Sequence, residues 1–438
     1  DVHIHFVGIK GTGMAALVEI MFHKGAIISG SDVSDRFYTD EILEKLNITP
    51  LPFSQLNISD QIDFVIYSSA YKLDVNPDLI AAQKKNIPCL LYTQALGQYS
   101  SKAYSCGVCG VHGKTSTTGL VGSILMQLPL PSQVLVGSMI NSFGNSCTFT
   151  SDLFKEQIKL KKATNNQFFI AETCEYQRHF MSFVPQKIIL TSVESDHQDY
   201  YPTYEDIRNA FVDYALKLPR NGDLIYCADD KGACDVVRIV KEKRGDINFI
   251  DYGYNAKGDF KILYEKVENE KNNFKIQCFN QQLSLSIPGK HEVLDAVAAI
   301  ALCCQLLNVC GMNHLDFIEK IKKGLINFTG GKRRTEKVGE ITTKNGNNVI
   351  IIDDYAHHPT AVKTTLAGYR EFYKTRKIVV DFMSHTYSRT KALLEEFSKC
   401  FSDADELILH KIYSSARENP SDFDIDGKCE EKEDVNCL

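Results

Sequence analysis

The sequence predicts an α/β protein divided into three domains, with a phosphate-binding loop in the central one. Three observations support this prediction. Apolar runs typical of buried strands alternate with helical segments. A short glycine-rich loop lies between a strand and a helix, and 438 residues are too many for a single hydrophobic core. We place the domains at residues 1–102, 103–328 and 329–438.

The N-terminal domain shows a strand–helix–strand order. An apolar helix follows the glycines of residues 8–13 and ends at Lys24-Gly25, a cation and a glycine that are typical of a helix C-terminus. This order predicts a parallel sheet covered by helices. A small and polar segment at residues 99–104 predicts the first domain boundary. Strands are expected at residues 3–7, 26–30 and 64–67.

The same alternation continues in the other two domains. Residues 255–287 alternate polar and apolar side chains and predict antiparallel hairpins, and a long helix is expected over residues 292–307. Residues 327–331 predict the second boundary, and the acidic segment 422–434 is expected to be weakly ordered. Further strands are expected at residues 167–171, 187–191, 349–352 and 378–380.

The phosphate loop is the segment Gly110-Val111-His112-Gly113-Lys114-Thr115-Ser116. Its glycines let backbone N–H groups approach a phosphate, and the helix N-terminus adds partial positive charge. The lysine supplies a full charge, and the Thr115 hydroxyl can ligate magnesium. Val108 stands where the full G-x-x-x-x-G-K-[ST] pattern has its first glycine. A glycine-rich turn with an ordinary surface lysine is the alternative.

Three candidate catalytic side chains follow strands of the central domain. Lys114, Glu172 and His197 each come after an apolar run, and ligands of parallel sheets bind beyond the carboxyl ends of the strands. We therefore expect one crevice in which cations offset phosphoryl charge and Glu172 holds magnesium directly or through water. Alternatives stay open: a surface acid at Glu172, a loop histidine at His197, a turn cap at Asp354 and His357, and solvated charges at Arg333 and Arg334.

A second glycine loop, Gly8-x-x-Gly11-x-Gly13, is followed by an acid, Asp32, at the end of the next strand. The spacing differs from the G-x-G-x-x-G of dinucleotide-binding proteins, which weakens a dehydrogenase interpretation. A diphosphate on the helix N-terminus still suits this loop. We interpret it as the binding site of a nucleotide-linked substrate, apart from the ATP site.

The composition excludes several classes of protein. A net charge of -6 argues against a nucleic-acid surface. We find no apolar stretch of about 18 residues and no signal peptide, although a few leading residues are expected to be missing. The 14 scattered cysteines fit reduced thiols and a cytoplasmic location. A zinc or redox site at Cys106-x-x-Cys109 is a weak alternative, because no second pair accompanies it.

The chain resembles the Mur ligases over nearly its whole length, and its motifs occur in the same order as in that family. Of the motifs given in the next sentence, the last three are highly specific together, whereas the first glycine loop alone is not. The resemblance lies in His5-Phe6-Val7-Gly8-Ile9-x-Gly11-x-Gly13-Met14, Gly110-x-His112-Gly113-Lys114-Thr115, Glu194-x-Asp196-His197-x-Asp199-Tyr200, Gly289-Lys290-His291, Lys332-Arg333-Arg334, Asp353-Asp354-Tyr355-x-His357-His358-Pro359-Thr360 and His385-x-Tyr387-Ser388-Arg389-Thr390.

The resemblance implies an N-terminal Rossmann-like domain for a UDP-sugar, a central phosphate-loop ATPase domain with a mostly parallel sheet, and a C-terminal Rossmann-like α/β domain for the amino acid. It also implies a reaction. ATP, with Mg²⁺, phosphorylates the lactyl carboxylate of UDP-N-acetylmuramate, and the amine of L-alanine attacks the acyl phosphate. Domain closure would assemble such a site. A monomer or homodimer without nucleic-acid or membrane partners is expected.

Each matching position receives a role from the resemblance. Catalytic roles fall on Lys114, Glu172, His197, His357 and Arg389, with the arginine as a carboxylate fork. The metal ligands would be Thr115, Glu172 and His197. The nucleotide would contact Gly110, His112, Gly113, Lys114, Thr115, Ser116, His291, Glu292, Asp295, Arg334 and Asp354. The substrates would contact Gly8, Lys10, Gly11, Thr12, Gly13, Met14, Asp32, Ser69 and, at the alanine site, Tyr355.

Several positions depart from the family pattern. Glu172-Thr173-Cys174-Glu175-Tyr176-Gln177 replaces the usual E-A-D-E-S-D, and Glu292 and Asp295 replace two asparagines that help to hold adenine. Carboxylates cannot donate hydrogen bonds as amides do, so nucleotide preference stays open. Family members continue beyond this C-terminus, so either a truncated chain or a shortened third domain is expected. The alternatives are a sister ligase that attaches a peptide to the same sugar nucleotide, an NAD(P)-dependent oxidoreductase, and a relative without catalysis.

Overall fold

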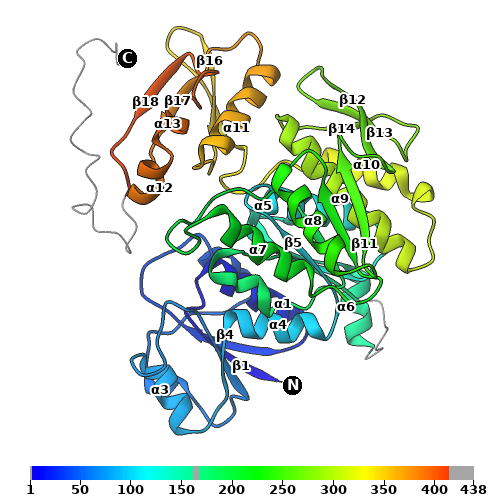
Figure 1. Cartoon of the computed structure of the whole chain (residues 1–438). Helices are drawn as coiled ribbons and strands as arrows, with labels where there is room; N and C mark the ends of the chain where they lie inside the picture. Colours follow the sequence, from blue (N-terminus) through cyan, green and yellow to red (C-terminus); the bar gives the residue numbers. More distant parts are fainter. Residues whose placement is uncertain (1, 161–166, 414–438) are drawn as a thin grey trace.

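The computed structural model describes residues 2–160 and 167–413 (Figure 1). The first unit is a parallel sheet in the order β2-β1-β3-β4, which confirms the three strands expected there. Its strands are β1 (His3–Val7), β2 (Ile27–Ser31), β3 (Phe64–Tyr67) and β4 (Cys89–Leu91). Its helices are α1 (Thr12–His23), α2 (Asp40–Lys45), η1 (Gln55–Asn57), α3 (Pro77–Lys84) and α4 (Tyr92–Ser101).

The central unit is a ten-stranded sheet in the order β14-β13-β12-β11-β10-β9-β5-β8-β6-β7. The strands from β12 to β6 in this order are parallel, and the two ends are antiparallel. The strands are β5 (Tyr104–Cys109), β6 (Ser132–Ile140), β7 (Ser146–Thr150), β8 (Phe168–Glu172), β9 (Lys187–Leu190), β10 (Asp223–Cys227), β11 (Asn248–Gly253), β12 (Phe260–Val267), β13 (Asn272–Ile276) and β14 (Leu283–Leu285). The expected hairpins are confirmed as β12 to β14.

The helices of this unit cover both faces of the sheet. They are α5 (Lys114–Leu125), η2 (Asn141–Phe143), α6 (Asp152–Lys159), η3 (Tyr176–Ser182), α7 (Tyr204–Ala215), α8 (Lys231–Lys243), α9 (Lys290–Val309), η4 (His314–Phe317) and α10 (Ile318–Asn327). One apolar core lies under α7 and α8 and continues into the first unit, and a second lies under α5, α9 and α10. Cys106 belongs to the second core and Cys109 to the first. Because the strand directs them to different cores, they do not form a zinc or redox pair.

Helix α9 corrects one expectation, since it is long and apolar enough to cross a membrane by length and composition. However, 78% of its apolar window is buried inside the protein. Its side chains pack in the core shared with α5 and α10. This burial is that of a core helix of the central unit.

The third unit contains two short sheets within the described residues. Strands β15 (Glu336–Thr342) and β16 (Asn348–Asp353) are antiparallel, whereas β17 (Val379–Phe382) and β18 (Glu406–Leu409) are parallel. The expected strands at 349–352 and 378–380 thus exist, but a hairpin replaces part of the parallel order. The helices are α11 (Pro359–Phe372), α12 (Tyr387–Ala392) and α13 (Leu394–Phe397). The segment 422–434 lies outside the described residues.

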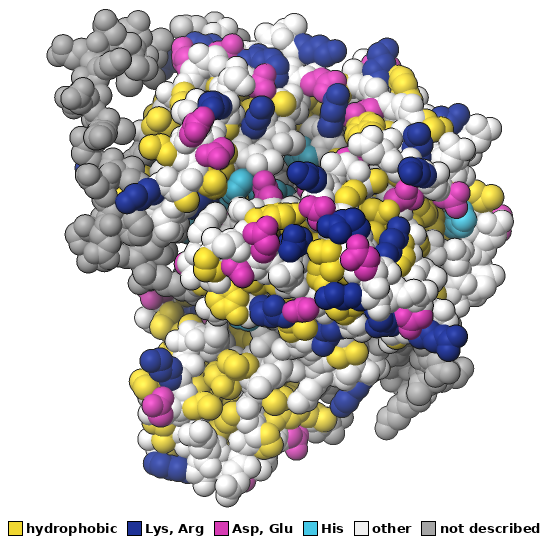
Figure 2. Space-filling model, in the orientation of Figure 1, with side chains coloured by type: hydrophobic (Ala, Val, Ile, Leu, Met, Phe, Trp, Pro, Cys, Tyr) yellow, Lys and Arg dark blue, Asp and Glu magenta, His cyan; other side chains and the backbone are white. Residues whose placement is uncertain are grey.

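The surface carries mixed charges. On the face drawn in Figure 2, basic and acidic side chains are interspersed over the central and third units. A nucleic-acid surface instead requires a basic patch or stripe. This distribution agrees with the small net charge of -6.

A buried acid joins the first unit to the central one. Glu19 of α1 accepts hydrogen bonds at Oε2 from Ser146 (2.6 Å) and Thr148 (3.1 Å) of β7. Burial raises the pKa of Glu19 from 4.5 to about 7, although both hydroxyl groups favour the charged form. The folded protein therefore binds more protons than the unfolded chain between these two pH values.

We expect Glu19→Gln to stabilise the protein at pH 8. Wild-type stability should fall as pH rises from 4.5 to about 7, because the unfolded chain ionises Glu19 more readily. The amide removes this dependence, and the gain at pH 8 is at most about 3 kcal/mol, since one pKa unit corresponds to ~1.4 kcal/mol. Urea unfolding at pH 5 and pH 8 measures it. Glu41→Gln, at an exposed position of α2, is the control; equal pH dependence in wild type and Glu19→Gln would contradict the assignment.

Candidate active site

A cleft of about 470 Å³ opens at the carboxyl ends of the central strands. It lies within the size range of small-molecule sites. The loops after β5, β8, β9 and β10 form its floor, the start of α9 forms one wall, and the third unit covers it. The predicted residues among its lining are His112, Gly113, Lys114, Thr115, Ser116, Glu172, His291, Glu292, Asp295, Arg334, Asp354 and His357.

The phosphate loop has the backbone that its glycines predict. Gly113 has φ +79°, directly before α5 begins at Lys114. A Cβ at Gly113 would lie 2.5 Å from Oδ1 of Asp295, and one at Gly110 would lie 2.0 Å from Oγ1 of Thr191. Both positions therefore exclude a side chain. The N-terminus of α5 is directed at the cleft and favours an anion there.

Lys114 is held by a carboxylate that the sequence did not single out. Its Nζ lies 3.0 Å from Oε2 of Glu175 and donates to the carbonyl groups of Gly110 and Val111. Burial opposes the charged ammonium, but Glu175 outweighs it and raises the pKa of Lys114. The same Glu175 carboxylate accepts a hydrogen bond from Nε2 of His197 at 3.2 Å. Lys114 and His197 are thus brought together through Glu175.

An oxygen pair beside Lys114 fits a magnesium ion. Thr115 donates from Oγ1 to Oε1 of Glu172 at 3.1 Å, and the backbone N–H of Gly137 donates to Oε2 at 2.8 Å. A hydroxyl and a carboxylate are the hard ligands that magnesium prefers. His197 lies beyond Glu175, so its role as a third ligand stays a prediction.

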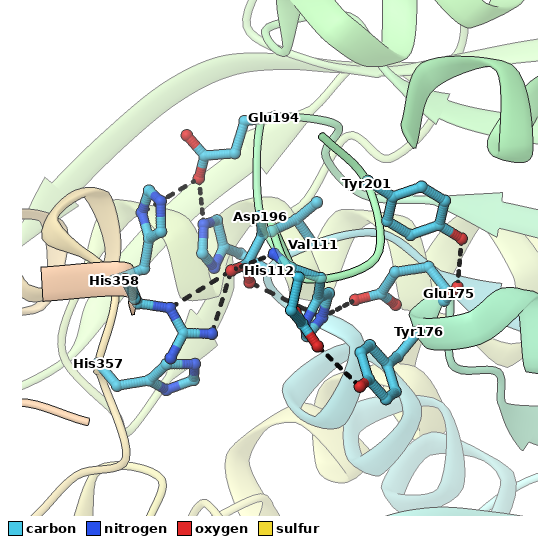
Figure 3. A network of polar contacts seen from close by, with 12 residues as sticks. Val111, His112, Glu175, Tyr176, Glu194, Asp196, Tyr201, His357 and His358 are labelled. Carbon is cyan, nitrogen blue, oxygen red and sulfur yellow. Dashed lines mark hydrogen bonds and ion pairs between the residues drawn. The ribbon is translucent and has the colours of Figure 1, made fainter. Parts of the chain in front are cut away.

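A second group of possible ligands joins the central and third units. The ligand atoms of His112, Glu194 and His358 lie within 4.8 Å of one another (Figure 3). Nε2 of His112 and Oε1 of Glu194 are in hydrogen-bond contact, and Oγ1 of Thr360 donates to Oε2 of Glu194 at 3.2 Å. These contacts fasten α11 to the loop after β9.

Arg389 lies at the same junction. Its Nη2 and Nε lie 3.0 and 3.3 Å from Oδ1 of Asp196, in the loop after β9. Burial, followed by the Arg389 charge, lowers the pKa of His357 to about 3. His357 is therefore neutral at pH 7, and its Nδ1 lies 2.8 Å from the carbonyl oxygen of Tyr355. The Tyr355 ring, 40% exposed, packs against His357 and under Arg333 and Arg334.

The wall made by α9 carries two buried acids. Ser116 donates to Glu292 at 3.1 Å and Thr117 donates to Asp295 at 3.0 Å. Burial raises the pKa of Glu292 to about 7 and raises that of Asp295 well above its usual value. Burial also lowers the pKa of His291 to about 4. Asp295 and His291 are therefore uncharged near neutral pH and Glu292 is only partly ionised, so this wall repels a phosphate less than two ionised acids would.

Asp354 and Arg334 complete this wall from the third unit. Both Asp354 oxygens accept backbone N–H groups, from Thr335 and Ala356 at 2.8 Å each. Burial raises the pKa of Asp354. The turn-cap interpretation of Asp354 is thus correct, and the capped carboxyl still lines the cleft.

The N-terminal glycine loop forms a separate site at the end of the first sheet. The backbone N–H of Lys10 donates to Asp32 at 2.7 Å, and the Tyr71 hydroxyl donates to it at 3.1 Å. Oγ1 of Thr12 contacts the hydroxyl of Tyr38, and Ser69 is exposed in the turn after β3. The other residues of this loop that are predicted to contact the substrate are Gly8, Gly11, Gly13 and Met14.

Two predicted residues of this loop already have partners within the protein, and their contact with the substrate stays a prediction. The Met14 side chain is buried in the apolar core, so only its backbone remains available to a ligand. The Lys10 ammonium lies 3.3 Å from Asp40 and donates to the carbonyl of Asp35, so its charge is already paired.

Tyr92 is a partly buried side chain at the glycine loop. A Cβ on Gly13 would lie 3.0 Å from its ring. Burial, followed by the nearby Glu172 carboxylate, raises the pKa of Tyr92. Sequence patterns gave no signal for Tyr92. Glu175, Glu194 and Asp196 could have been found from the sequence, because each of them follows shortly after a predicted strand.

A mostly parallel sheet with a phosphate loop at its centre, covered by a further α/β unit, defines a nucleotide-binding protein of the phosphate-loop class. Three family profiles match the chain. They are the Mur ligase family, catalytic domain at residues 3–104, the Mur ligase middle domain at 108–303, and the Mur ligase, glutamate ligase domain at 333–431.

Curated relatives cover almost the same length. The UDP-N-acetylmuramate--L-alanine ligase of Treponema pallidum (strain Nichols) is 45% identical over 419 residues, 95% of this chain and 83% of that protein. That of Borreliella burgdorferi is 40% identical over 425 residues, 95% and 86% of the two chains. The chain therefore belongs to the Mur ligase family and is an enzyme of the ligase class.

Solved structures agree with this assignment. UDP-N-acetylmuramate-alanine ligase MurC from Thermotoga maritima superposes with a TM-score of 0.72 and 25% identity, covering 94% of this chain and 86% of that one. The murein peptide ligase mpl from Psychrobacter arcticus shares the fold, with a TM-score of 0.65 and 20% identity over 95% and 91% of the chains.

Proposed function

We propose that the protein joins L-alanine to the lactyl carboxylate of UDP-N-acetylmuramate, with ATP and Mg²⁺, in the synthesis of peptidoglycan precursors. One observation carries the proposal. The phosphate loop, the Thr115–Glu172 pair and the third-unit residue His357 line one cleft, and Arg389 of the third unit pairs with Asp196 in the loop after β9, which contributes other residues to the same cleft. The two curated relatives above carry the name of this activity.

The chain's own groups suit this reaction. Lys114 and the N-terminus of α5 offset the charge of the phosphates. Thr115 and Glu172 would hold magnesium, which when bound neutralises charge that develops on the transferred phosphoryl group. The neutral His357 and the Arg389 guanidinium would bind the amino acid from the third unit. We further propose a cytoplasmic location and a monomeric or homodimeric state.

A substrate-omission assay tests the proposal. Phosphate release should require ATP, Mg²⁺, UDP-N-acetylmuramate and L-alanine together, and omission of any one should reduce it to background. Comparing alanine, serine, glycine and a tripeptide as acceptors separates this ligase from a sister enzyme that attaches a peptide. Turnover with the tripeptide but not with alanine would overturn the proposed acceptor. No release with any acceptor would favour a relative without catalysis.

A further inference from the structure

Asp196 is a buried carboxylate with two different partners. Its Oδ1 accepts from Nε and Nη2 of Arg389, which belongs to α12 of the third unit. The same oxygen also accepts a hydrogen bond from the backbone N–H of His197 at 2.8 Å. Asp196 is 5% exposed and Arg389 is 8% exposed. The contact thus joins two units in a place largely shielded from water.

The donors of Arg389 are only partly used by these contacts. A guanidinium carries five N–H donors. Nε and Nη2 each direct one N–H to Asp196, and Nη1 donates one to the carbonyl oxygen of His385 at 2.8 Å. One N–H on each terminal nitrogen is left. Two parallel donors of this kind match the two oxygens of a carboxylate.

His197, whose backbone N–H donates to Asp196, has further contacts of its own. His197 has a left-handed backbone with φ +55°, and its ring is fixed on Glu175 at 3.2 Å. Through its contacts with Arg389, Asp196 anchors the guanidinium to the loop after β9.

We propose that Asp196 is a positioning residue: it fixes Arg389 so that the two remaining terminal N–H groups bind the carboxylate of the incoming amino acid. The proposal rests on the proposed function, because it needs an amino acid as acceptor. Without Asp196, the long side chain of Arg389 would sample several rotamers. Ordering its guanidinium group when the substrate binds would then lower the affinity for the substrate carboxylate. Asp196 would thus set the preference for acceptors that carry a free carboxylate.

The experiment compares L-alanine with L-alaninamide, which keeps the amine and lacks the charged carboxylate. The quantity measured is the ratio of kcat/KM for the two acceptors, in wild type and in each variant. Differences in the intrinsic reactivity of the two amines cancel when the ratios are compared between proteins. We expect Asp196→Ala to lower the ratio at least tenfold, to about the ratio of Arg389→Ala, as charged hydrogen bonds of this kind discriminate by roughly 10- to 100-fold.

Two controls make the result decisive. Asp199→Asn changes an exposed acid three residues away, which contacts Tyr176, and should leave the ratio unchanged. If Asp196→Ala does not fold, Asp196→Asn keeps the side-chain volume and removes the charge, and its ratio decides. An equal loss with both acceptors in the folded variant would mean a purely structural role and would overturn the proposal. Failure of the proposed function is distinguishable, because wild type itself would then show no alanine-dependent phosphate release.

Discussion

Lys114→Ala should abolish ATP-dependent phosphate release, with a loss in kcat of at least about 10²–10³-fold, which is typical when a charge-stabilising contact in the transition state is removed. Lys114 is the cation at the start of α5, next to the Thr115–Glu172 pair. A colorimetric phosphate assay at saturating substrates measures the loss. Unchanged turnover would refute its assigned role.

Glu175 must be considered in the same experiment. It is 2% exposed and pairs with Lys114 at 3.0 Å, and removing one partner of such a pair costs about 3–5 kcal/mol because a buried charge is left alone. The double variant Lys114→Ala/Glu175→Gln removes both charges. We expect it to be more stable than either single variant, because neither charge is left buried alone, and still inactive. Recovery of activity in the double variant would show that the single change acted only through folding.

Glu172→Gln should reduce kcat/KM by about 10²–10³-fold and raise the Mg²⁺ concentration needed for half the maximal rate, because an amide oxygen is a far weaker ligand for a hard cation than a carboxylate. The substitution keeps the size of the side chain, and its oxygen can still accept from Gly137, as Oε2 does at 2.8 Å. Titration of the rate with MgCl₂ measures the effect.

Thr115→Ser is the matched control for this result. It keeps the hydroxyl that donates to Glu172 at 3.1 Å, and the rate and its Mg²⁺ dependence should change little. A normal Mg²⁺ requirement in Glu172→Gln would place the metal elsewhere, and the group formed by His112, Glu194 and His358 would then be the first alternative.

The crevice could be predicted from sequence because it depends on local patterns. Glu172 ends an apolar strand and Lys114 follows a glycine loop, and the carboxyl ends of parallel strands meet at one edge of a sheet. β5 lies between β8 and β9, so these residues converge without any knowledge of side-chain contacts.

Contacts between distant segments could not be predicted in this way. Asp196 and Arg389 are 193 positions apart, and their pairing depends on how the third unit packs on the central one. The pairing of Lys114 with Glu175 depends on the turn after β8, where two residues have left-handed backbone. The hairpin of β15 and β16 was also missed, because a short apolar run is the same in parallel and antiparallel strands.

The place of Tyr92 has a consequence for inhibitor design. Its partly buried ring packs at Gly13, where a Cβ would lie 3.0 Å from it, and burial together with the charge of the Glu172 carboxylate raises the pKa of its hydroxyl group. A compound that links a diphosphate mimic at the glycine loop to a metal-chelating group at Glu172 would have to accommodate this ring. Linker shape is therefore the first variable to test in such bivalent molecules.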